Sequence, residues 1–443
     1  MMTYQNFETR INTLIGNRNI ALSLLSVITV IALFPTFSNE LMTGWDDQWQ
    51  VTNTFTSGGF TFENLKEIFT VSFHGQYSPV NQCLYILIYE IGGYTPIYYH
   101  AASLILHVLN GWLVFFILKQ LLVSTTSLSA NRIAWICFLT TLLFLIHPLQ
   151  VETVAWMSAS KIVLSTFFYL LATYAFLGYL AKERMYYYLL TVFFFTCAYG
   201  AKEQSVIFPL WIILIASFYK LNFSSRKIWL MILPFFALAV FYGLMFVFEI
   251  KARPFGHVTN SLFDFSWWQR VVFSCYALIE YPLKWFVPYK LLYMYYYPMN
   301  PGEPLPVWLL AYPTLLAIIL VSLWKPLNHW SVKSGILFFL IHILLVLHII
   351  PISRPHVVAD RYMYLASTGL SFIVFYLLTQ YYPQWKPIAR RIMGLIILLA
   401  VITFGTYTYH RTHTWHDTKN LRHELKILLK NHGEQPDEIV FGL

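Results

Sequence analysis

Two adjacent aspartates, Asp46 and Asp47, stand in the segment TGWDDQWQVTN, directly after the first long hydrophobic stretch of the chain. They are conspicuous because only 11% of the residues are Asp, Glu, Lys or Arg. A carboxylate can act as a general base that removes the proton of an acceptor hydroxyl as the hydroxyl attacks. Because two carboxylates this close disfavour each other's ionisation, we expect only one of them to be the base.

A second set of ionisable side chains lies in short segments between later hydrophobic stretches. Ionisable groups near a membrane are costly unless they are paired or face water, so each is a candidate functional residue. Basic groups bind a phosphate that becomes a leaving group, and these candidates are Lys202, Arg354 and Arg361. The other candidates, which could bind further groups of a substrate, are His147, Glu152, Glu203, His356 and Asp360. The simplest assembly is one cavity with carboxylates at one end and basic groups at the other.

Several of these residues also have purely structural interpretations. The aspartate pair could be an ordinary solvated loop. The adjacent Lys202 and Glu203 could form a pair that caps the ends of two helices, and Asp360 with Arg361 could form an ion pair that anchors a loop. The sequence leaves these alternatives open.

No metal or cofactor is expected to be required. His147, Glu152 and His356 could supply metal ligands, but their spacing is not that of a known metal motif. The sequence does not exclude a divalent cation near the aspartates. The four cysteines are scattered through apolar segments, so we expect small buried side chains and no disulfide framework.

The composition is that of an integral membrane protein. Of the 443 residues, 58% are hydrophobic, and the mean hydropathy is +0.58. A soluble domain has roughly 45–50% apolar and about 25% charged residues. The net charge of +9 suits anionic lipid headgroups or an anionic substrate. Nucleic acid is not an expected partner, because no basic block stands outside the membrane pattern.

A helix that crosses a bilayer needs about 20 mostly apolar residues. Eleven ranges qualify as predicted spans, and they are 20–37, 96–118, 132–147, 161–180, 186–200, 204–219, 228–248, 306–324, 334–350, 362–381 and 391–409. Two further stretches, 78–92 and 267–288, are rich in aromatic residues and interrupted by polar residues or proline. We expect these two to lie in the interface or to re-enter the membrane.

The distribution of basic residues predicts the orientation. An N-terminus in the cytoplasm, with 20–37 as an uncleaved signal anchor, places many Lys and Arg in short cytoplasmic segments. A full span at 267–288 would move the basic segment 383–391 outside, so this stretch is predicted not to cross. The chain then divides into a membrane domain, 1–409, and an extracytoplasmic tail, 410–443, with an amphipathic helix over LRHELKILLK.

The order of motifs along the chain resembles that of the GT-C membrane glycosyltransferases. The resemblance is strongest to the membrane half of the transmembrane-and-TPR protein O-mannosyltransferases and their bacterial relatives. The matching stretches are WDDQWQVTN, FHGQYSPVNQCLY, YYHAASLILHVLN, LFLIHPLQVETVAWMSASK, YGAKEQSVIFPL, KARPF, VADRYMYLASTGL and RTHTWHDTKNL. The resemblance implies an all-α GT-C fold with amphipathic helices in the first outer loop, a polyprenyl-phosphate sugar donor and inverting transfer.

The resemblance also implies roles for particular residues. An acidic residue in the first outer loop is the base, which favours Asp46 as the first acidic residue after the first span. Lys202 and Arg361 would bind the donor phosphate, and Glu152 with His147 would shape the acceptor or sugar side. The sugar favoured is a mannose-like hexose.

The identity of the acceptor stays open. Eukaryotic members of the family continue into TPR repeats that hold protein partners, and this chain reaches Leu443 without them. The acceptor is therefore a protein, a lipid or a glycan, and we expect a bacterial inner membrane with the site facing the periplasm. The alternatives are a cell-envelope oligosaccharide ligase or polymerase that uses a lipid-diphosphate donor, a transporter of lipid-linked sugars, and a scaffold without catalysis.

Overall fold

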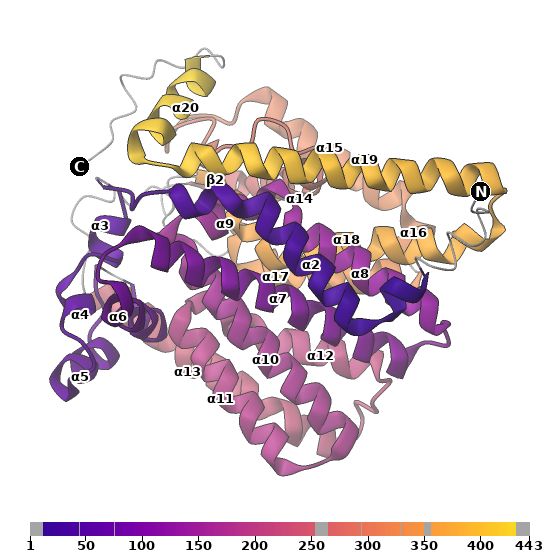
Figure 1. Cartoon of the computed structure of the whole chain (residues 1–443), viewed down its shortest axis with the longest axis horizontal. Helices are drawn as coiled ribbons and strands as arrows, with labels where there is room; N and C mark the ends of the chain where they lie inside the picture. The colour runs from indigo at the N-terminus through magenta and orange to yellow at the C-terminus, as the bar shows by residue number, and fades with distance from the viewer. Residues whose placement is uncertain are drawn as a thin grey trace.

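The computed structural model describes residues 12–43, 45–74, 76–252, 265–293, 295–327, 329–349 and 356–430. In these ranges the chain folds into a bundle of helices (Figure 1). The described strands are β1 (Tyr295–Tyr296) and β2 (His356–Val358), which pair in antiparallel fashion. The all-α architecture expected from the sequence is therefore confirmed. Arg354, one of the predicted phosphate ligands, lies outside the described residues.

Within the described ranges, six helical stretches are long and apolar enough to cross a membrane. They are built on α2 (Arg18–Leu33), α7 (Pro96–Thr125), α10 (Ser160–Lys182), α13 (Arg226–Ala252), α18 (Met363–Tyr381) and α19 (Pro387–Thr412). A seventh candidate is broken. It combines α8 (Ala130–Ile146) with the 148–155 segment, which ends in α9 (Val151–Ala155), and the two parts are bent by 51°. The break follows from Pro148, because the residue before a proline avoids helical angles, and His147 is extended.

Four shorter apolar helices occupy four more of the predicted ranges. They are α11 (Met185–Ala201), α12 (Phe208–Phe218), α15 (Ala311–Ser322) and α17 (Trp330–Ile343). The helix α14 (Trp267–Phe286) lies where a non-crossing segment was predicted, and it is not among the candidate spans of the described residues. A total of eleven crossings stays a prediction.

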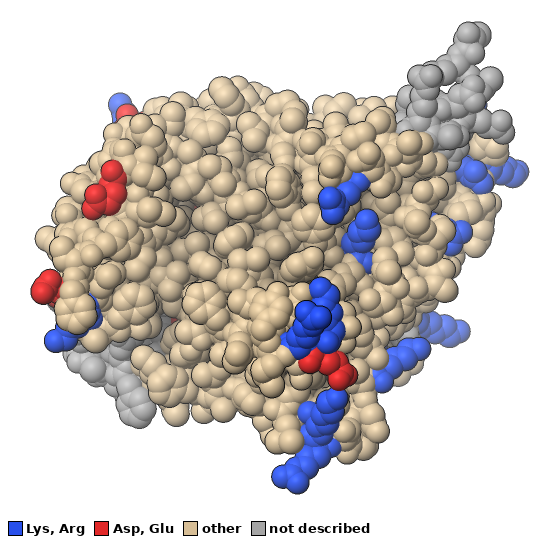
Figure 2. All heavy atoms as spheres, turned by 60° about the horizontal axis from the view of Figure 1, so that its bottom comes forward, with Lys and Arg blue, Asp and Glu red and all other residues tan. Residues whose placement is uncertain are grey.

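The surface is consistent with a bundle embedded in lipid. Figure 2 shows a broad area without charged side chains, with most of the visible Lys and Arg gathered toward one end of this face. The apolar stretch of α19 is also exposed along its length, including Ile392, Leu395 and Ile402. In water such a surface would be unfavourable, whereas hydrocarbon chains cover it without cost.

Four short helices follow the first candidate span and form what we call the loop segment, residues 45–93. It consists of α3 (Asp47–Gln50), α4 (Thr54–Ser57), α5 (Phe62–Thr70) and α6 (Pro79–Gly92). Asn53 and Thr61 accept hydrogen bonds from the first turns of α4 and α5, which defines where each begins. The stretch FENLKEIF has helical periodicity in the sequence, and it forms α5. Figure 1 shows the loop segment at one end of the bundle, in indigo and violet.

The C-terminal part of the described chain belongs to the same end of the bundle. The helix α19 continues through Thr412, past the domain boundary expected at 409, and buries Arg411. After it, Trp415 is buried and stacks on Trp156 with ring centroids 5.6 Å apart. The predicted amphipathic helix forms as part of α20 (Thr418–Lys430). Arg411, Thr412 and Trp415 are therefore buried against the rest of the bundle, and the division into a membrane domain, 1–409, and a tail, 410–443, stays a prediction.

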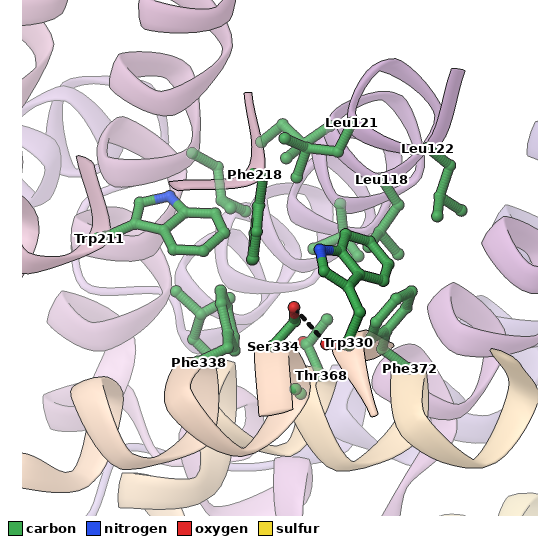
Figure 3. Close-up of a pocket in the computed structure, with 16 residues that line it drawn as sticks. Leu118, Leu121, Leu122, Trp211, Phe218, Trp330, Ser334, Phe338, Thr368 and Phe372 are labelled. Carbon is green, nitrogen blue, oxygen red and sulfur yellow. Dashed lines mark hydrogen bonds between the residues drawn. The ribbon is translucent and has the colours of Figure 1, made fainter. Parts of the chain in front are cut away.

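An apolar cavity lies between α7, α10, α12, α17 and α18 (Figure 3). Its volume is about 60 Å³, and its walls are almost wholly apolar. Two of the lining residues, Gly335 and Gly369, let α17 and α18 approach closely, since a Cβ on Gly369 would lie 2.4 Å from the Gly335 carbonyl oxygen. Leu365 lines both this cavity and a second hollow described below.

Candidate active site

The carboxylate of Asp47 is fixed by three hydrogen bonds. Oδ2 accepts from the backbone N–H of Met42 at 2.9 Å, and Oδ1 accepts from the backbone N–H of Ser158 at 2.8 Å and from the Ser158 hydroxyl. The residue is only 1% exposed. Burial raises the pKa of Asp47 to about 6, although the hydrogen bonds from Ser158 and Met42 oppose the change. Asp47 therefore ties the loop segment to the turn before α10.

Asp46 has a different environment. It precedes α3, it is partly buried, and its side chain does not cap the helix. The indole N–H of Trp49 donates to its carboxylate, and the positive charges of Lys161 and Arg361 attract it. Burial raises the pKa of Asp46 above the ordinary value of 3.8, and these three partners work in the opposite direction. Of the two adjacent aspartates, Asp46 is the one turned toward the basic groups.

Lys161 lies in the first turn of α10 and links two parts of the site. Its ammonium donates to the side-chain carbonyl of Gln50 at 3.0 Å and to that of Gln76. It also interacts electrostatically with Lys202 and Arg361. Lys161 is not among the residues predicted for the site. The sequence did contain a signal for this residue, because Lys161 begins a predicted span. An ionisable residue at membrane depth is a candidate functional residue.

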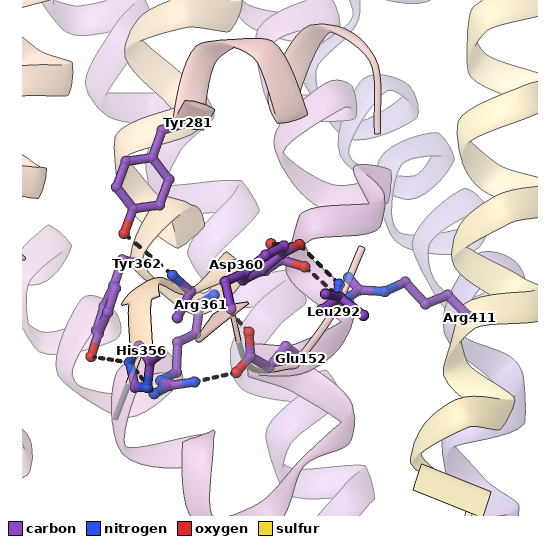
Figure 4. Close-up of polar contacts among 10 residues, drawn as sticks. Glu152, Tyr281, Leu292, His356, Asp360, Arg361, Tyr362 and Arg411 are labelled. Atoms are coloured by element: carbon purple, nitrogen blue, oxygen red, sulfur yellow. Dashed lines mark hydrogen bonds and ion pairs between the residues drawn. The ribbon is translucent and has the colours of Figure 1, made fainter. Parts of the chain in front are cut away.

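Arg361 is held by Glu152 and by aromatic rings (Figure 4). The backbone N–H of Arg361 donates to Glu152 at 2.9 Å, and its guanidinium forms an ion pair with the same carboxylate. The guanidinium also lies 5.6 Å from the ring centre of Trp156 and 3.0 Å from Nε2 of His356. Glu152 is fully buried, so it orients Arg361 and is not itself free to contact a sugar.

The neighbouring Asp360 pairs with the far end of the chain. Its carboxylate accepts from Arg411 at 2.7 Å and from the Tyr295 hydroxyl at 3.0 Å (Figure 4). Arg411 in turn donates to the Pro148 carbonyl at 2.6 Å. Asp360 and Arg361 could have paired with each other by their sequence, but the structure has two other ion pairs. Asp360 pairs with Arg411, and Arg361 pairs with Glu152. Arg411 was missed, because nothing in the local sequence connects it to Asp360.

Lys202 and Arg361, predicted to act together on a phosphate, line one hollow, which we call the cationic hollow. It has a volume of about 60 Å³ and lies between α10, the turn 202–207, α17 and the start of α18. Lys202 also lies 3.6 Å from Glu203. His342 lines the same hollow, and its Nε2 has no partner among the described residues. The two cations, Lys202 and Arg361, suit an anionic ligand.

The two predicted histidines lie beside the cationic hollow and do not line it. His147 is buried. Its Nε2 lies 2.8 Å from the Trp285 carbonyl oxygen, and its Nδ1 accepts a hydrogen bond from the backbone N–H of Leu149. It therefore joins α8 to α14 and does not line the cationic hollow. His356 contacts Arg361 and the Tyr362 hydroxyl, the latter at 3.3 Å. Both histidines are occupied with positioning their neighbours.

Comparison with known proteins gives one weak similarity. The chain is 29% identical over 133 residues to the protein O-mannosyl-transferase Tmtc1 of Drosophila melanogaster. The aligned part covers 30% of this chain and 14% of that relative. No protein-family model and no solved structure matches the chain. The similarity therefore concerns a short part of a protein O-mannosyl-transferase.

Proposed function

We propose that this protein is an inverting glycosyltransferase that moves a hexose from a polyprenyl-phosphate donor to an acceptor hydroxyl. The observation that carries the proposal is the charge arrangement around Arg361. This guanidinium attracts the Asp46 carboxylate and also lines the cationic hollow with Lys202. A base and a phosphate site therefore adjoin, as transfer from a phosphosugar requires. The similarity to a protein O-mannosyl-transferase supports the same reaction class.

The proposed reaction is a single displacement. Asp46 takes the proton of the acceptor hydroxyl, and the hydroxyl oxygen forms a bond to the anomeric carbon of the sugar. The bond from that carbon to the phosphate oxygen breaks on the opposite side, and its electron pair leaves with the polyprenyl phosphate. Lys202 and Arg361 stabilise the charge that develops on the phosphate, which is commonly the largest contribution to such catalysis. Glu152 keeps Arg361 in place without touching the substrate.

The apolar cavity supports a donor that carries a hydrocarbon chain. Leu365 lines both the cationic hollow and the cavity of Figure 3, so the two spaces meet at one side chain. An isoprenoid chain is more stable against apolar walls than in water. The proposal includes three further points. The sugar is a mannose-like hexose, the site faces the periplasm, and the acceptor is a protein, a lipid or a glycan.

The pH dependence of transfer tests the environment of Asp46. A base is active only when ionised, so activity falls as the pH drops through its pKa. Because burial raises the pKa of Asp46, we expect the acidic limb of the pH–rate profile to have its midpoint above 3.8, the ordinary pKa of an aspartate. Trp49→Phe removes the hydrogen bond that favours the ionised form, so the limb should move to still higher pH. Single-turnover rates between pH 4 and 8 measure this shift; an unchanged limb in Trp49→Phe contradicts the assignment.

Lys202→Met tests the phosphate site. The substitution removes the charge and keeps the aliphatic stem, so binding of the donor should weaken. Hydrogen bonds to charged groups contribute about 1.5–3 kcal/mol, which corresponds to roughly a 10- to 100-fold rise in the donor KM. The matched control is Lys182→Met, since Lys182 is exposed at the other end of α10 and bonds to Tyr187. An equal effect of both variants on the donor KM would contradict the role of Lys202.

The whole proposal is tested with purified protein in nanodiscs. Radiolabelled polyprenyl-phosphate mannose, glucose and galactose are offered with peptide, lipid and glycan acceptors, and products are separated by chromatography. We expect transfer or donor hydrolysis with at least one monophosphate donor. Activity only with an oligosaccharide on a lipid diphosphate would favour the ligase alternative, in which the aspartates bind acceptor or hold the structure.

A further inference from the structure

A pocket with several times the volume of the cationic hollow lies where the C-terminal end of α19 meets α20. Its volume is about 250 Å³. The walls come from the segment 290–293 before β1, the last turns of α19, the turn 413–415 and α20. Figure 1 shows α20 beside this end of α19. We call it the terminal pocket, and its polar lining residues are Lys290, Tyr407, His410, Arg411, Thr414 and Glu424.

Two opposite charges on the wall of the terminal pocket are not compensated. Neither the exposed ammonium of Lys290 nor the exposed carboxylate of Glu424 forms an ion pair or a hydrogen bond with any of the described residues. The Lys290 backbone also has φ +47°, which is unfavourable for a residue with a Cβ and is found most often at ligand sites. Arg411, by contrast, is neutralised by Asp360. The pocket therefore offers a ligand one free cation and one free anion.

The outer face of α19 places the terminal pocket at the level of the lipid headgroups. Ile392 and Leu399 are exposed on this face. His410 follows them by about five and about three helical turns, so the three side chains lie on one side of the helix. Five turns span about 27 Å, close to the roughly 30 Å of a hydrocarbon core. A crossing α19 therefore carries an apolar face through the hydrocarbon and reaches the headgroups at the pocket.

The two free charges define the headgroup that fits. The phosphate diester of a phospholipid carries one negative charge, which suits Lys290 and a hydrogen bond from His410. A headgroup without a positive charge would leave Glu424 unpaired. A primary ammonium donates three hydrogen bonds to a carboxylate, whereas a trimethylammonium donates none. We propose that the terminal pocket binds phosphatidylethanolamine, with the phosphate on Lys290 and the ammonium on Glu424.

The surroundings of the terminal pocket agree with a lipid ligand. While the headgroup occupies the pocket, the acyl chains pack against the exposed apolar face of α19, which removes apolar surface from water. The pocket also adjoins the candidate active site, because Arg411 forms part of its wall and pairs with Asp360. Binding of the lipid does not depend on the proposed transfer reaction, since no residue assigned to the base or to the donor phosphate lines this pocket.

Lipid selection is measured by native mass spectrometry of the full chain in detergent. The protein is supplied with equal amounts of phosphatidylethanolamine, phosphatidylcholine and phosphatidylglycerol, all with the same acyl chains. Identical chains remove any difference in apolar contact, so only the headgroup decides which lipid is retained. We expect phosphatidylethanolamine to be retained in preference to the other two. Retention without preference overturns the proposal.

Two substitutions change the two contacts separately. Glu424→Gln removes the negative charge at nearly constant size, so the preference for phosphatidylethanolamine over phosphatidylglycerol should fall about two- to fivefold, the effect of an exposed ion pair. Lys290→Met should lower the retention of both lipids by a similar factor, because both carry the phosphate. The two residues are exposed, so the Tm of the lipid-free protein should stay parental in each variant.

Matched controls carry the same chemical changes outside the terminal pocket. Lys419→Met alters an exposed lysine of α20, and Glu67→Gln alters an exposed glutamate of α5. Both should retain the parental mixture of lipids. A parental preference in both pocket variants, or an equal loss of preference in the controls, overturns the proposal.

A competition experiment separates a lipid from a soluble ligand. Glycerophosphoethanolamine has the same headgroup without acyl chains, so it should displace the bound lipid only at a large excess. Displacement at equal concentration would overturn the assignment to a lipid. None of these measurements needs a sugar donor. If no donor supports turnover but the headgroup preference depends on Lys290 and Glu424, the glycosyltransferase proposal fails and the lipid site stands.

Discussion

Asp46→Asn is expected to lower the rate of transfer by about 10²–10⁴-fold, the usual contribution of a general base. The amide has the shape of the carboxylate but cannot accept the proton of the attacking hydroxyl. The fold should persist, because Asp46 caps no helix and is only partly buried. The expected result is therefore a protein with the parental Tm, with donor binding nearly unchanged and with almost no turnover. Rates of transfer and of donor hydrolysis, measured beside a thermal melt, check this.

The neighbouring residue supplies the control for this experiment. Asp47→Asn is the same chemical change one position along the chain, but it should act on stability. The backbone N–H groups of Met42 and Ser158 both donate to the Asp47 carboxylate. In Asp47→Asn, the NH₂ group of the amide would face one of these two donors, and that hydrogen bond would be lost. The loss of a buried partner costs about 1–3 kcal/mol, so the Tm should fall. Full activity in Asp46→Asn, together with an inactive but stable Asp47→Asn, would transfer the role of base to Asp47.

Arg411→Met is expected to be the most destabilising single change considered for this protein. It leaves the carboxylate of Asp360, 2% exposed, without its ion-pair partner. It also removes the donor to the Pro148 carbonyl. Breaking a buried ion pair by removing one partner costs about 3–5 kcal/mol, which is a large part of the stability of most domains. The measurement is the denaturation midpoint in detergent, together with the yield of folded protein.

Two companion variants test the reason for that loss. The double change Asp360→Leu with Arg411→Met removes both charges, so it should recover part of the stability that the single change loses. Recovery should be incomplete, because the Tyr295 hydroxyl and the Pro148 carbonyl also lose their partner. Arg390→Met, near the other end of α19, is the matched control and should have a small effect. A double variant less stable than Arg411→Met would contradict the ion-pair explanation.

The sequence predicted those parts of the protein that depend on local pattern. Apolar runs of sufficient length located the long helices such as α7 and α18, and the periodicity of FENLKEIF located α5. Lys202 and Arg361 were predicted to act together, and they line one hollow. The helices could be located because burial in lipid selects apolar residues. That Lys202 and Arg361 bind a phosphate stays a prediction.

The partners of the charged residues could not be predicted in the same way. Glu152 lies 209 positions from Arg361, and Asp360 lies 51 from Arg411, so only the packing of the helices decides which charges meet. Asp46 and Asp47 are adjacent and chemically identical in sequence. Their difference comes from Ser158, which reaches only one of them.

The crossed pairing at Asp360 and Arg361 also has a consequence for how the protein is made. Arg361 belongs to the site, yet the residue beside it is secured by Arg411, at the end of the last membrane-length helix in the described chain. Asp360 therefore cannot form this pair until the ribosome has made α19, which carries its partner 51 positions further along the chain. Until α19 has been inserted, the carboxylate lacks the charge that compensates it. The closing of this corner of the candidate site is therefore a late step in folding.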